Sequence, residues 1–295
     1  MADGREAGAR RNKRRKARLA ALAAVLAAVS AWLIWGNSAL MTTRIAVRSP
    51  RIPQEFDGFC IAQVSDLHDA QFGEDNSALA ALIAESAPDI IVITGDLIDS
   101  NRTDIDRALS FARRAVEIAP IYYVTGNHEG ALMEYWRLRD GLSELGVHVL
   151  TDRSETITRG GAAIRLIGLD DPNFATHEEI AAGFDAMIHE KLVKLTAEDE
   201  YGVLLAHRPE YIESYAAGGV DLALCGHAHG GQVRLPLVGG LIAPGQGLLP
   251  RYDSGLYTLG GTDMIVSRGL GNSVFPLRVN NRPELVLITL QHGSD

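Results

Sequence analysis

The chain has 295 residues, of which 46% are hydrophobic and 22% charged, so it can bury a sizeable core and is too apolar to be disordered. Its net charge of −9 is unevenly distributed, because the first 18 residues carry +6 and the remainder therefore carries −15. An acidic body argues against nucleic acid as a partner, since a phosphate backbone requires positive surface. We expect one catalytic domain behind a basic N-terminal appendage.

An uncharged apolar segment, Leu19 to Gly36, follows the basic block at 10–18. The segment is rich in Ala, Leu and Val, and Trp32 and Trp35 lie near its far end. A helix of about 18 to 20 apolar residues can span a bilayer, and tryptophans suit the membrane interface. The sequence therefore predicts a single-pass membrane anchor within residues 1–45 and a catalytic domain in residues 46–295.

Two targeting signals are alternatives to an uncleaved anchor. A cleaved signal peptide would usually have a shorter apolar core, and no clean A-x-A site follows this one. Arg14-Arg15 weakly suggests a twin-arginine signal, but the residues after the pair match it poorly. Because basic residues stay on the cytoplasmic side, an anchor would put the body on the extracytoplasmic side of the cell membrane.

Strand-like and helix-like runs alternate along the body. Strands are expected at 44–47, 59–64, 89–94, 121–125, 147–150, 155–158, 163–169, 203–206, 221–225, 263–266 and 284–290. Helices are expected at 77–86, 103–118, 132–145 and 177–194, with a short one opened by Pro209. The βαβ start predicts parallel strands with helical crossovers, and the β-rich second half predicts a second, mixed sheet.

Side chains that can bind metal follow five of these strand-like runs. They lie in Asp66-Leu67-His68, Gly95-Asp96, Gly126-Asn127-His128-Glu129, His207 and Gly226-His227-Ala228-His229. Each motif alone has an ordinary explanation as a turn, a helix lead-in or a structural histidine. The carboxyl ends of strands in an open α/β sheet converge on one crevice, so we expect the five to build one site.

The chemistry of these side chains favours a pair of transition-metal ions. Asp66 and His68 are two residues apart at a strand exit, so both can point to one side. Carboxylate, amide and imidazole ligands together suit manganese, iron or zinc rather than magnesium or calcium alone. Asp96 could bridge two ions through its two oxygens, and two ions about 3.5–4 Å apart can clamp a phosphoryl group.

In this order the five motifs resemble those of the calcineurin-like metallophosphoesterases. The longer run Gly226 to Gln232, together with an N-terminal anchor, is similar to the membrane-associated bacterial phosphodiesterase branch of that superfamily. The resemblance covers roughly residues 57–290. It implies a four-layer α/β/β/α sandwich of two mixed sheets, with the site at the strand ends.

The resemblance also implies two ligand sets that share Asp96. One metal would be held by Asp66, His68, Asp96 and His229. The other would be held by Asp96, Asn127, His207 and His227. By the same resemblance, His128 would be the catalytic histidine that stabilises or protonates the leaving oxygen. Adjacent residues cannot easily both aim at one ion, so Asn127 and His128 should have different roles. The alternative for His128 is a hydrogen bond to a ligand.

Two further features bear on the substrate. Arg268 follows the strand at 263–266 and could either reach a phosphate or form a surface ion pair. The stretch Leu235 to Tyr257 combines apolar side chains with glycines and prolines directly after His229. It is either a mobile apolar loop suited to a lipid-linked substrate or a β-hairpin packed on the core.

We therefore interpret the chain as a membrane-anchored, dinuclear metallophosphoesterase that hydrolyses phosphodiester or pyrophosphate bonds, with a lipid or lipid precursor as a candidate substrate. The alternative within the same fold is a non-catalytic metal-binding scaffold. A dinuclear oxidase is a further alternative, although the Glu-x-x-His pairs of ferritin-type iron sites are lacking.

Overall fold

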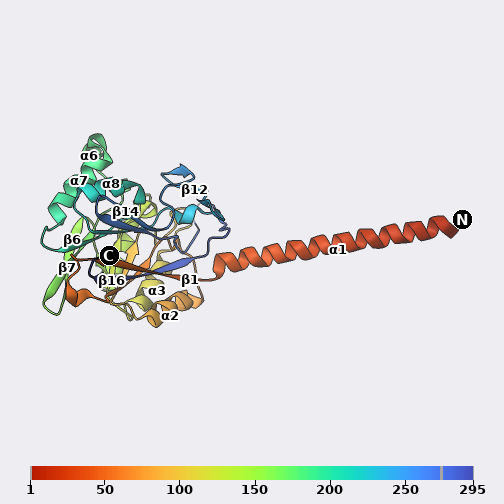
Figure 1. The fold of residues 1–295 in the computed structure, drawn as a ribbon, viewed down its shortest axis with the longest axis horizontal. Coiled ribbons are helices and arrows are strands. Elements are labelled where there is room, and N and C mark those ends of the chain that lie inside the picture. The colour runs from red at the N-terminus through yellow and green to blue at the C-terminus, as the bar shows by residue number, and fades with distance from the viewer. Residues whose placement is uncertain (1, 273–274, 295) are drawn as a thin grey trace.

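The computed structural model describes residues 2–272 and 275–294. Two six-stranded sheets pack face to face, and helices cover the outer face of each (Figure 1). The first sheet contains, in spatial order, β1 (Met41–Ser49), β16 (Glu284–His292), β2 (Cys60–Val64), β3 (Ile90–Thr94), β4 (Ile121–Val124) and β5 (His148–Val149). The second contains β14 (Gly255–Leu259), β15 (Thr262–Val266), β9 (Leu222–Cys225), β8 (Tyr201–Leu205), β7 (Ala162–Gly168) and β6 (Arg153–Arg159).

The helices form the two outer layers. The first sheet is covered by α2 (Ser77–Ser86), α3 (Ile105–Ala115) and α5 (Tyr135–Glu144). The second is covered by α7 (Phe184–Leu195) and α8 (Ile212–Ala217), with α6 (His177–Ala182) beside α7. This arrangement confirms the predicted four-layer sandwich of two mixed sheets.

Side chains along each buried strand point alternately to its two faces, and this divides the core into layers. On β3, Ile91 and Ile93 join the core beneath the helices, whereas Val92 joins the core between the sheets. Successive strand residues point to opposite faces, so a strand covered on both sides must be apolar at every position. That requirement explains the uninterrupted apolar run from which the strand was predicted.

One predicted helix is divided in the structure. The expected helix at 177–194 is two helices, α6 and α7, separated by Gly183. Gly183 has φ 90° and ψ 144°, a conformation that only glycine adopts readily. The helical prediction was correct for both parts and wrong in joining them.

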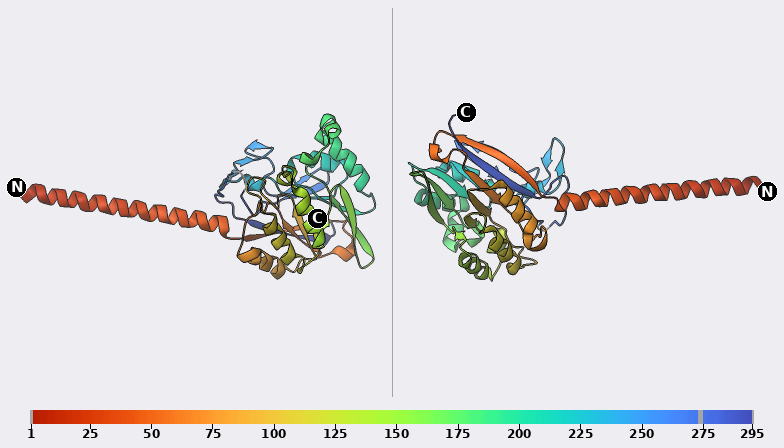
Figure 2. Two further views of the ribbon diagram at one scale, coloured as in Figure 1. Left: turned by 180° about the vertical axis from the view of Figure 1, so that it is seen from behind. Right: turned by 90° about the horizontal axis from the view of Figure 1, so that it is seen from below.

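The N-terminal helix α1 (Ala2–Ser38) leaves the body as one long rod (Figures 1 and 2). Its segment Arg11–Ser38 is long and apolar enough to cross a membrane, and none of its apolar window is buried by the body. Only Ala39 and Leu40 separate α1 from β1, so the body is attached to the helix almost directly.

Strand directions put the carboxyl ends of β2, β3 and β4 at the end of the body that carries α1. β1 starts there and runs parallel to β16, which pairs antiparallel with β2. β3 and β4 run parallel to β2. The segments that follow these three strands therefore lie near the attachment of α1.

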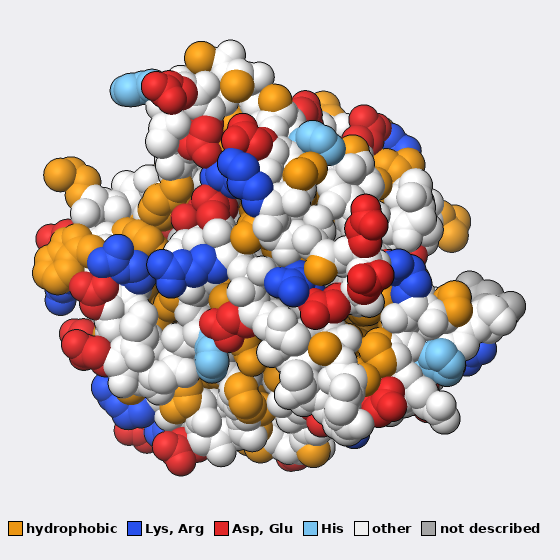
Figure 3. Space-filling view, turned by 90° about the vertical axis from the view of Figure 1, so that its left-hand side faces the viewer, with side chains coloured by type: hydrophobic (Ala, Val, Ile, Leu, Met, Phe, Trp, Pro, Cys, Tyr) orange, Lys and Arg blue, Asp and Glu red, His pale blue; other side chains and the backbone are white. Residues whose placement is uncertain are grey.

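The face of the body farthest from α1 has a different character. Acidic and basic side chains are interspersed there, with scattered apolar ones among them (Figure 3). Mixed charge of this kind is typical of an ordinary solvated surface.

Candidate metal centre

The structure brings together all seven side chains that the strand-end motifs indicated as ligands. Candidate ligand atoms within 4.8 Å of one another form two groups, Asp66–His68–Asp96–His229 and Asp96–His207–His227. Asn127 joins the second group, because its Oδ1 lies 3.1 Å from Nε2 of His207. We call these seven residues the strand-end cluster. Its aspartates and histidines are all buried.

The backbone of the strand-end cluster is mostly left-handed. Positive φ angles occur at Asp66 (50°), His68 (46°), Asp96 (50°), His227 (65°) and His229 (49°). Residues other than glycine rarely adopt this conformation, and such strain collects at functional sites. The sequence argument had aligned Asp66 and His68 by strand alternation. That reason is wrong, because β2 ends at Val64 and a left-handed loop carries both residues.

Close backbone approach explains the glycines in the motifs. A Cβ atom on Gly226 would lie 2.0 Å from Oγ of Ser65, and one on Gly126 would lie 2.2 Å from Oδ1 of Asp96. Real Cβ atoms do not approach so closely, so any side chain at either position would displace the strand-end cluster.

The protonation of His207 shows why the strand-end cluster suits a cation. Its Nδ1 lies 2.8 Å from the carbonyl oxygen of Thr94, which can only accept, so Nδ1 carries the proton in the neutral ring. Nε2 then presents a lone pair toward Oδ2 of Asp96 at 3.2 Å and Oδ1 of Asn127 at 3.1 Å. Electron pairs facing one another in a buried site require a positive charge between them.

The electrostatics of the strand-end cluster point the same way. Burial opposes a charge on His207, but the carboxylates of Asp96 and Asp66 raise its pKa to about 10, so without a metal a proton on Nε2 supplies the positive charge between these groups. Burial also opposes ionisation of Asp96, but His207 and His68 hold its pKa well below the ordinary value. Burial lowers the pKa of His68 to about 4, which leaves a neutral imidazole with a lone pair. A buried set of this composition fits divalent metal ions.

Glu129 organises the loops around the strand-end cluster. Its two carboxylate oxygens accept four backbone hydrogen bonds, from Asp96 (2.9 Å), Leu97 (2.7 Å), Ile98 (3.3 Å) and Gly126 (2.7 Å). The side chain thereby ties the loop after β3 to the start of α4 (Asn127–Gly130).

Replacing Glu129 by Gln is expected to destabilise the fold, because the amide NH₂ must face backbone donors. Unsatisfied buried donors cost about 1–3 kcal/mol each, so we expect a loss of at least about 2 kcal/mol in the free energy of unfolding. Denaturant unfolding checks this, with the exposed Glu144→Gln as the control. Equal stability of the two variants would contradict the role given to Glu129.

His128 adjoins the strand-end cluster without joining either group. Its ring lies edge-on to His68, with centroids 4.5 Å apart, and its backbone N–H donates to Oδ1 of Asp96 at 2.8 Å. The backbone N–H of Ser100 donates to Nδ1 of His128 at 3.0 Å. An N–H group can only donate, so Nδ1 accepts and the proton of the neutral ring is on Nε2.

Asp99 lies next to this histidine, with Oδ1 3.7 Å from Nδ1 of His128. Asp104, rather than Asp99, caps α3, because its side chain accepts a hydrogen bond from the backbone N–H of Arg107. Sequence reasoning also missed Arg278, which is buried with Nη2 3.4 Å from Nδ1 of His229. A single arginine in a loop carries no local signal that would have identified it.

Comparison with known proteins agrees with this geometry. The sequence profile of the calcineurin-like phosphoesterase family matches residues 60–231. The metallophosphoesterase YkuE of Bacillus subtilis is 31% identical over 255 residues, 85% of each chain. The phosphodiesterase YaeI of Escherichia coli is 30% identical over 242 residues, 79% of this chain and 82% of that protein.

A third relative, from Bos taurus, is named transmembrane protein with metallophosphoesterase domain. It is 28% identical over 261 residues, which are 84% of this chain and 56% of that protein. With a family profile that covers more than half of the chain, and a buried Asp/His cluster suited to divalent metals, the protein belongs to the calcineurin-like phosphoesterases, which are metal-dependent hydrolases of phosphoester bonds.

Proposed function

We propose that this protein is a membrane-anchored dinuclear phosphoesterase that cleaves phosphodiester or pyrophosphate bonds at the membrane surface. Residues 1–45 would be the anchor and residues 46–295 the catalytic domain. One observation carries the proposal: the strand-end cluster lies at the end of the body from which α1 leaves. A helix that crosses the bilayer would hold that end against the lipid head groups.

The two groups of the strand-end cluster would hold one ion each. Asp66, His68, Asp96 and His229 would bind the first, and Asp96, Asn127, His207 and His227 the second. Manganese, iron and zinc all suit these ligands. When bound, such ions would neutralise phosphoryl charge and lower the pKa of water.

His128 would assist the departure of the leaving group by protonating it. Its Nε2 carries the proton in the tautomer fixed by Ser100, so the ring can donate that proton to the departing oxygen. Because Nδ1 of His128 accepts a hydrogen bond, the ring cannot rotate freely and stays aimed beside the strand-end cluster.

The surface beside His229 would suit the apolar part of a lipid-linked substrate. A pocket of about 360 Å³ lies there, walled by Ile242, Ala243 and Phe275. The adjoining hairpins are β10–β11 (Arg234–Leu235 and Gly239–Gly240) and β12–β13 (Ile242–Ala243 and Gly247–Leu248).

These hairpins present apolar side chains to solvent rather than packing all of them on the core. The exposed fractions are 108% for Leu237, 80% for Leu248 and 63% for Leu249. The hairpins lie at the same end of the body as the attachment of α1 in each view (Figures 1 and 2). Apolar side chains at that end could enter the membrane interface together with the anchor.

Replacing Leu248 and Leu249 together by Asp is expected to impair cleavage of a diester presented in vesicles while sparing bis-p-nitrophenyl phosphate in solution. The reason is that two charges would oppose insertion into the interface. Initial rates of the full-length protein on both substrates measure the effect. The matched control is Ile180→Asp with Val193→Asp, two exposed apolar side chains on α6 and α7. Equal losses of activity on both substrates would contradict the proposal that the substrate is lipid-linked.

We further propose that the body lies outside the cytoplasm, because the basic block precedes the apolar segment. Protease added to spheroplasts should then degrade the body. Protection of the body from protease would show that it lies in the cytoplasm.

The bond preference is tested with the full-length protein loaded with Mn²⁺. We expect chelator-sensitive cleavage of bis-p-nitrophenyl phosphate to exceed cleavage of p-nitrophenyl phosphate. Preference for the monoester would contradict the diesterase assignment. Bound metal without cleavage of these esters, of vesicle lipid or of a pyrophosphate would favour the non-catalytic scaffold. Against a scaffold, all seven predicted ligand positions carry side chains that can bind metal.

A further inference from the structure

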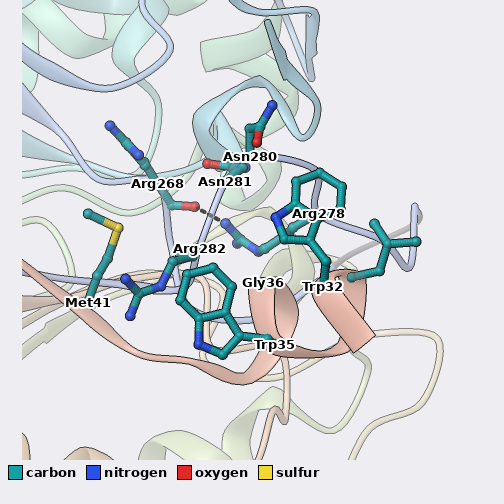
Figure 4. A pocket seen from close by; sticks show the side chains of 10 residues that line it. Trp32, Trp35, Gly36, Met41, Arg268, Arg278, Asn280, Asn281 and Arg282 are labelled. Carbon is teal, nitrogen blue, oxygen red and sulfur yellow. Dashed lines mark hydrogen bonds between the residues drawn. The ribbon is translucent and has the colours of Figure 1, made fainter. Parts of the chain in front are cut away.

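A second pocket, distinct from the strand-end cluster, lies where α1 meets the body. Its volume is about 250 Å³, and its lining includes Trp32, Trp35, Arg268, Arg278, Asn281 and Arg282 (Figure 4). Both tryptophans come from the last turns of α1, whereas the three arginines come from the segment that connects β15 to β16. We call it the Trp–Arg pocket.

The arginines give the Trp–Arg pocket a positive character. Glu284 offsets part of the charge, with Oε1 3.6 Å from Nε of Arg268. Arg278 donates to the carbonyl oxygens of Arg268 and Gly271. Arg282 donates to the backbone of Ala39 at 2.9 Å. Three guanidinium groups around one acid leave the pocket suited to an anion.

Two buried polar atoms at the Trp–Arg pocket have no hydrogen-bond partner in the described part of the chain. They are Oδ1 of Asn281, an acceptor, and Nε of Arg268, a donor that Glu284 approaches only to 3.6 Å, beyond hydrogen-bond distance. Asn281 is 1% exposed. Buried polar groups normally find partners, so Oδ1 of Asn281 indicates a ligand that offers a donor, and the incompletely paired guanidinium of Arg268 can take an acceptor from the same ligand. A phosphate oxygen and a hydroxyl group meet these two requirements.

The level at which the Trp–Arg pocket would lie in the membrane points to a lipid as the source of that phosphate. The 18 residues from Leu19 to Gly36 span about 27 Å as a helix, close to the thickness of a bilayer core. Trp32 and Trp35 then lie at the interface, where tryptophan is favoured. Arg282 stacks over the Trp35 ring, 4.8 Å from its centroid, which holds the arginine at the same depth. Lipid phosphates lie at this level of the membrane.

The Trp–Arg pocket is connected to the strand-end cluster through its inner wall. Asn281 donates through Nδ2 to the carbonyl oxygen of His229 at 2.7 Å. Asn37, at the end of α1, exchanges two hydrogen bonds with the backbone of Arg278, at 3.0 and 2.8 Å. Arg278 in turn lies beside the His229 ring. An occupant of the pocket would therefore brace the helix, the loop and a candidate metal ligand together.

We propose that the Trp–Arg pocket binds the head group of an anionic, hydroxyl-bearing phospholipid of the surrounding membrane, with Arg268 contacting its phosphate and Asn281 its hydroxyl. This inference rests on the proposed anchoring by α1. The site holds a lipid against the body and is separate from the place where the phosphoester is cleaved.

The test measures lipid retained by the full-length protein in detergent, using native mass spectrometry. The probes are phosphatidylglycerol, phosphatidylcholine and inorganic phosphate as a competitor. We expect retention of phosphatidylglycerol over phosphatidylcholine, and a roughly tenfold weaker retention in Arg268→Gln. Arg268→Lys should recover part of it, and Arg159→Gln, an exposed arginine elsewhere, should have no effect.

Bound metal per chain is measured on each variant as a check that the strand-end cluster is folded. Equal retention of the two lipids, or wild-type retention by Arg268→Gln in a metal-loaded protein, would overturn the proposal. Displacement of the lipid by equimolar inorganic phosphate would assign the pocket to soluble phosphate instead. Failure of the proposed function would differ from these outcomes, because it would appear as a folded protein without metal or hydrolysis.

Discussion

Replacing Asp96 by Asn is expected to empty both halves of the strand-end cluster and to lower diester cleavage by at least about 10³-fold. Asp96 is the carboxylate shared by the two groups of candidate ligands. Its Oδ2 lies 3.2 Å from Nε2 of His207 and 3.5 Å from Nε2 of His68. Asparagine keeps the size of the side chain but removes the negative charge that two cations would share.

Metal content by elemental analysis and the initial rate on bis-p-nitrophenyl phosphate measure this effect together. Asp104→Asn is the matched control, since it makes the same chemical change at the N-cap of α3, where Asn serves equally well. If Asp96→Asn retained two ions per chain and most of its activity, the bridging role would be wrong.

Replacing His128 by Ala is expected to lower kcat by about 10²- to 10³-fold while the metal content is unchanged. The histidine is fixed by Ser100 and lies beside the strand-end cluster, but it belongs to neither group of candidate ligands. Removing the ring should therefore remove a proton donor and leave the metal sites intact.

The leaving group provides a sharper test of His128. A diester with an alkyl leaving group needs protonation more than one with p-nitrophenol, so His128→Ala should lose more activity on the alkyl diester. His148→Ala, at a partly exposed histidine on β5, is the control. Loss of metal from His128→Ala, or an equal loss on both diesters, would assign this histidine a structural role.

The strand ends could be predicted because their signals are local. Buried strands such as β3 require apolar residues on both faces, and the residues that follow must then lie at the sheet edge. The glycines before Asp96 and His227 are local signals as well, because they mark tight turns where a backbone passes close to a side chain. The identity and approximate position of all seven members of the strand-end cluster followed from such patterns.

The details that could not be predicted depend on contacts distant in sequence. The left-handed backbone at Asp66 and His68 is held by loops that follow other strands, for example through the hydrogen bond from the backbone N–H of His68 to the carbonyl oxygen of Asp96. The contact between Asn37 and Arg278 joins residues 241 positions apart. No periodicity or motif in the sequence indicates that the helix and this arginine meet beside His229.

The most direct test of the central claim is the number of metal ions bound per chain, measured on the full-length protein alongside its rate on bis-p-nitrophenyl phosphate before and after chelation. We predict two ions per chain, loss of cleavage on chelation, and recovery when Mn²⁺ is restored. A folded protein that binds no metal, or that cleaves the diester equally well after its metal has been removed, would contradict the account.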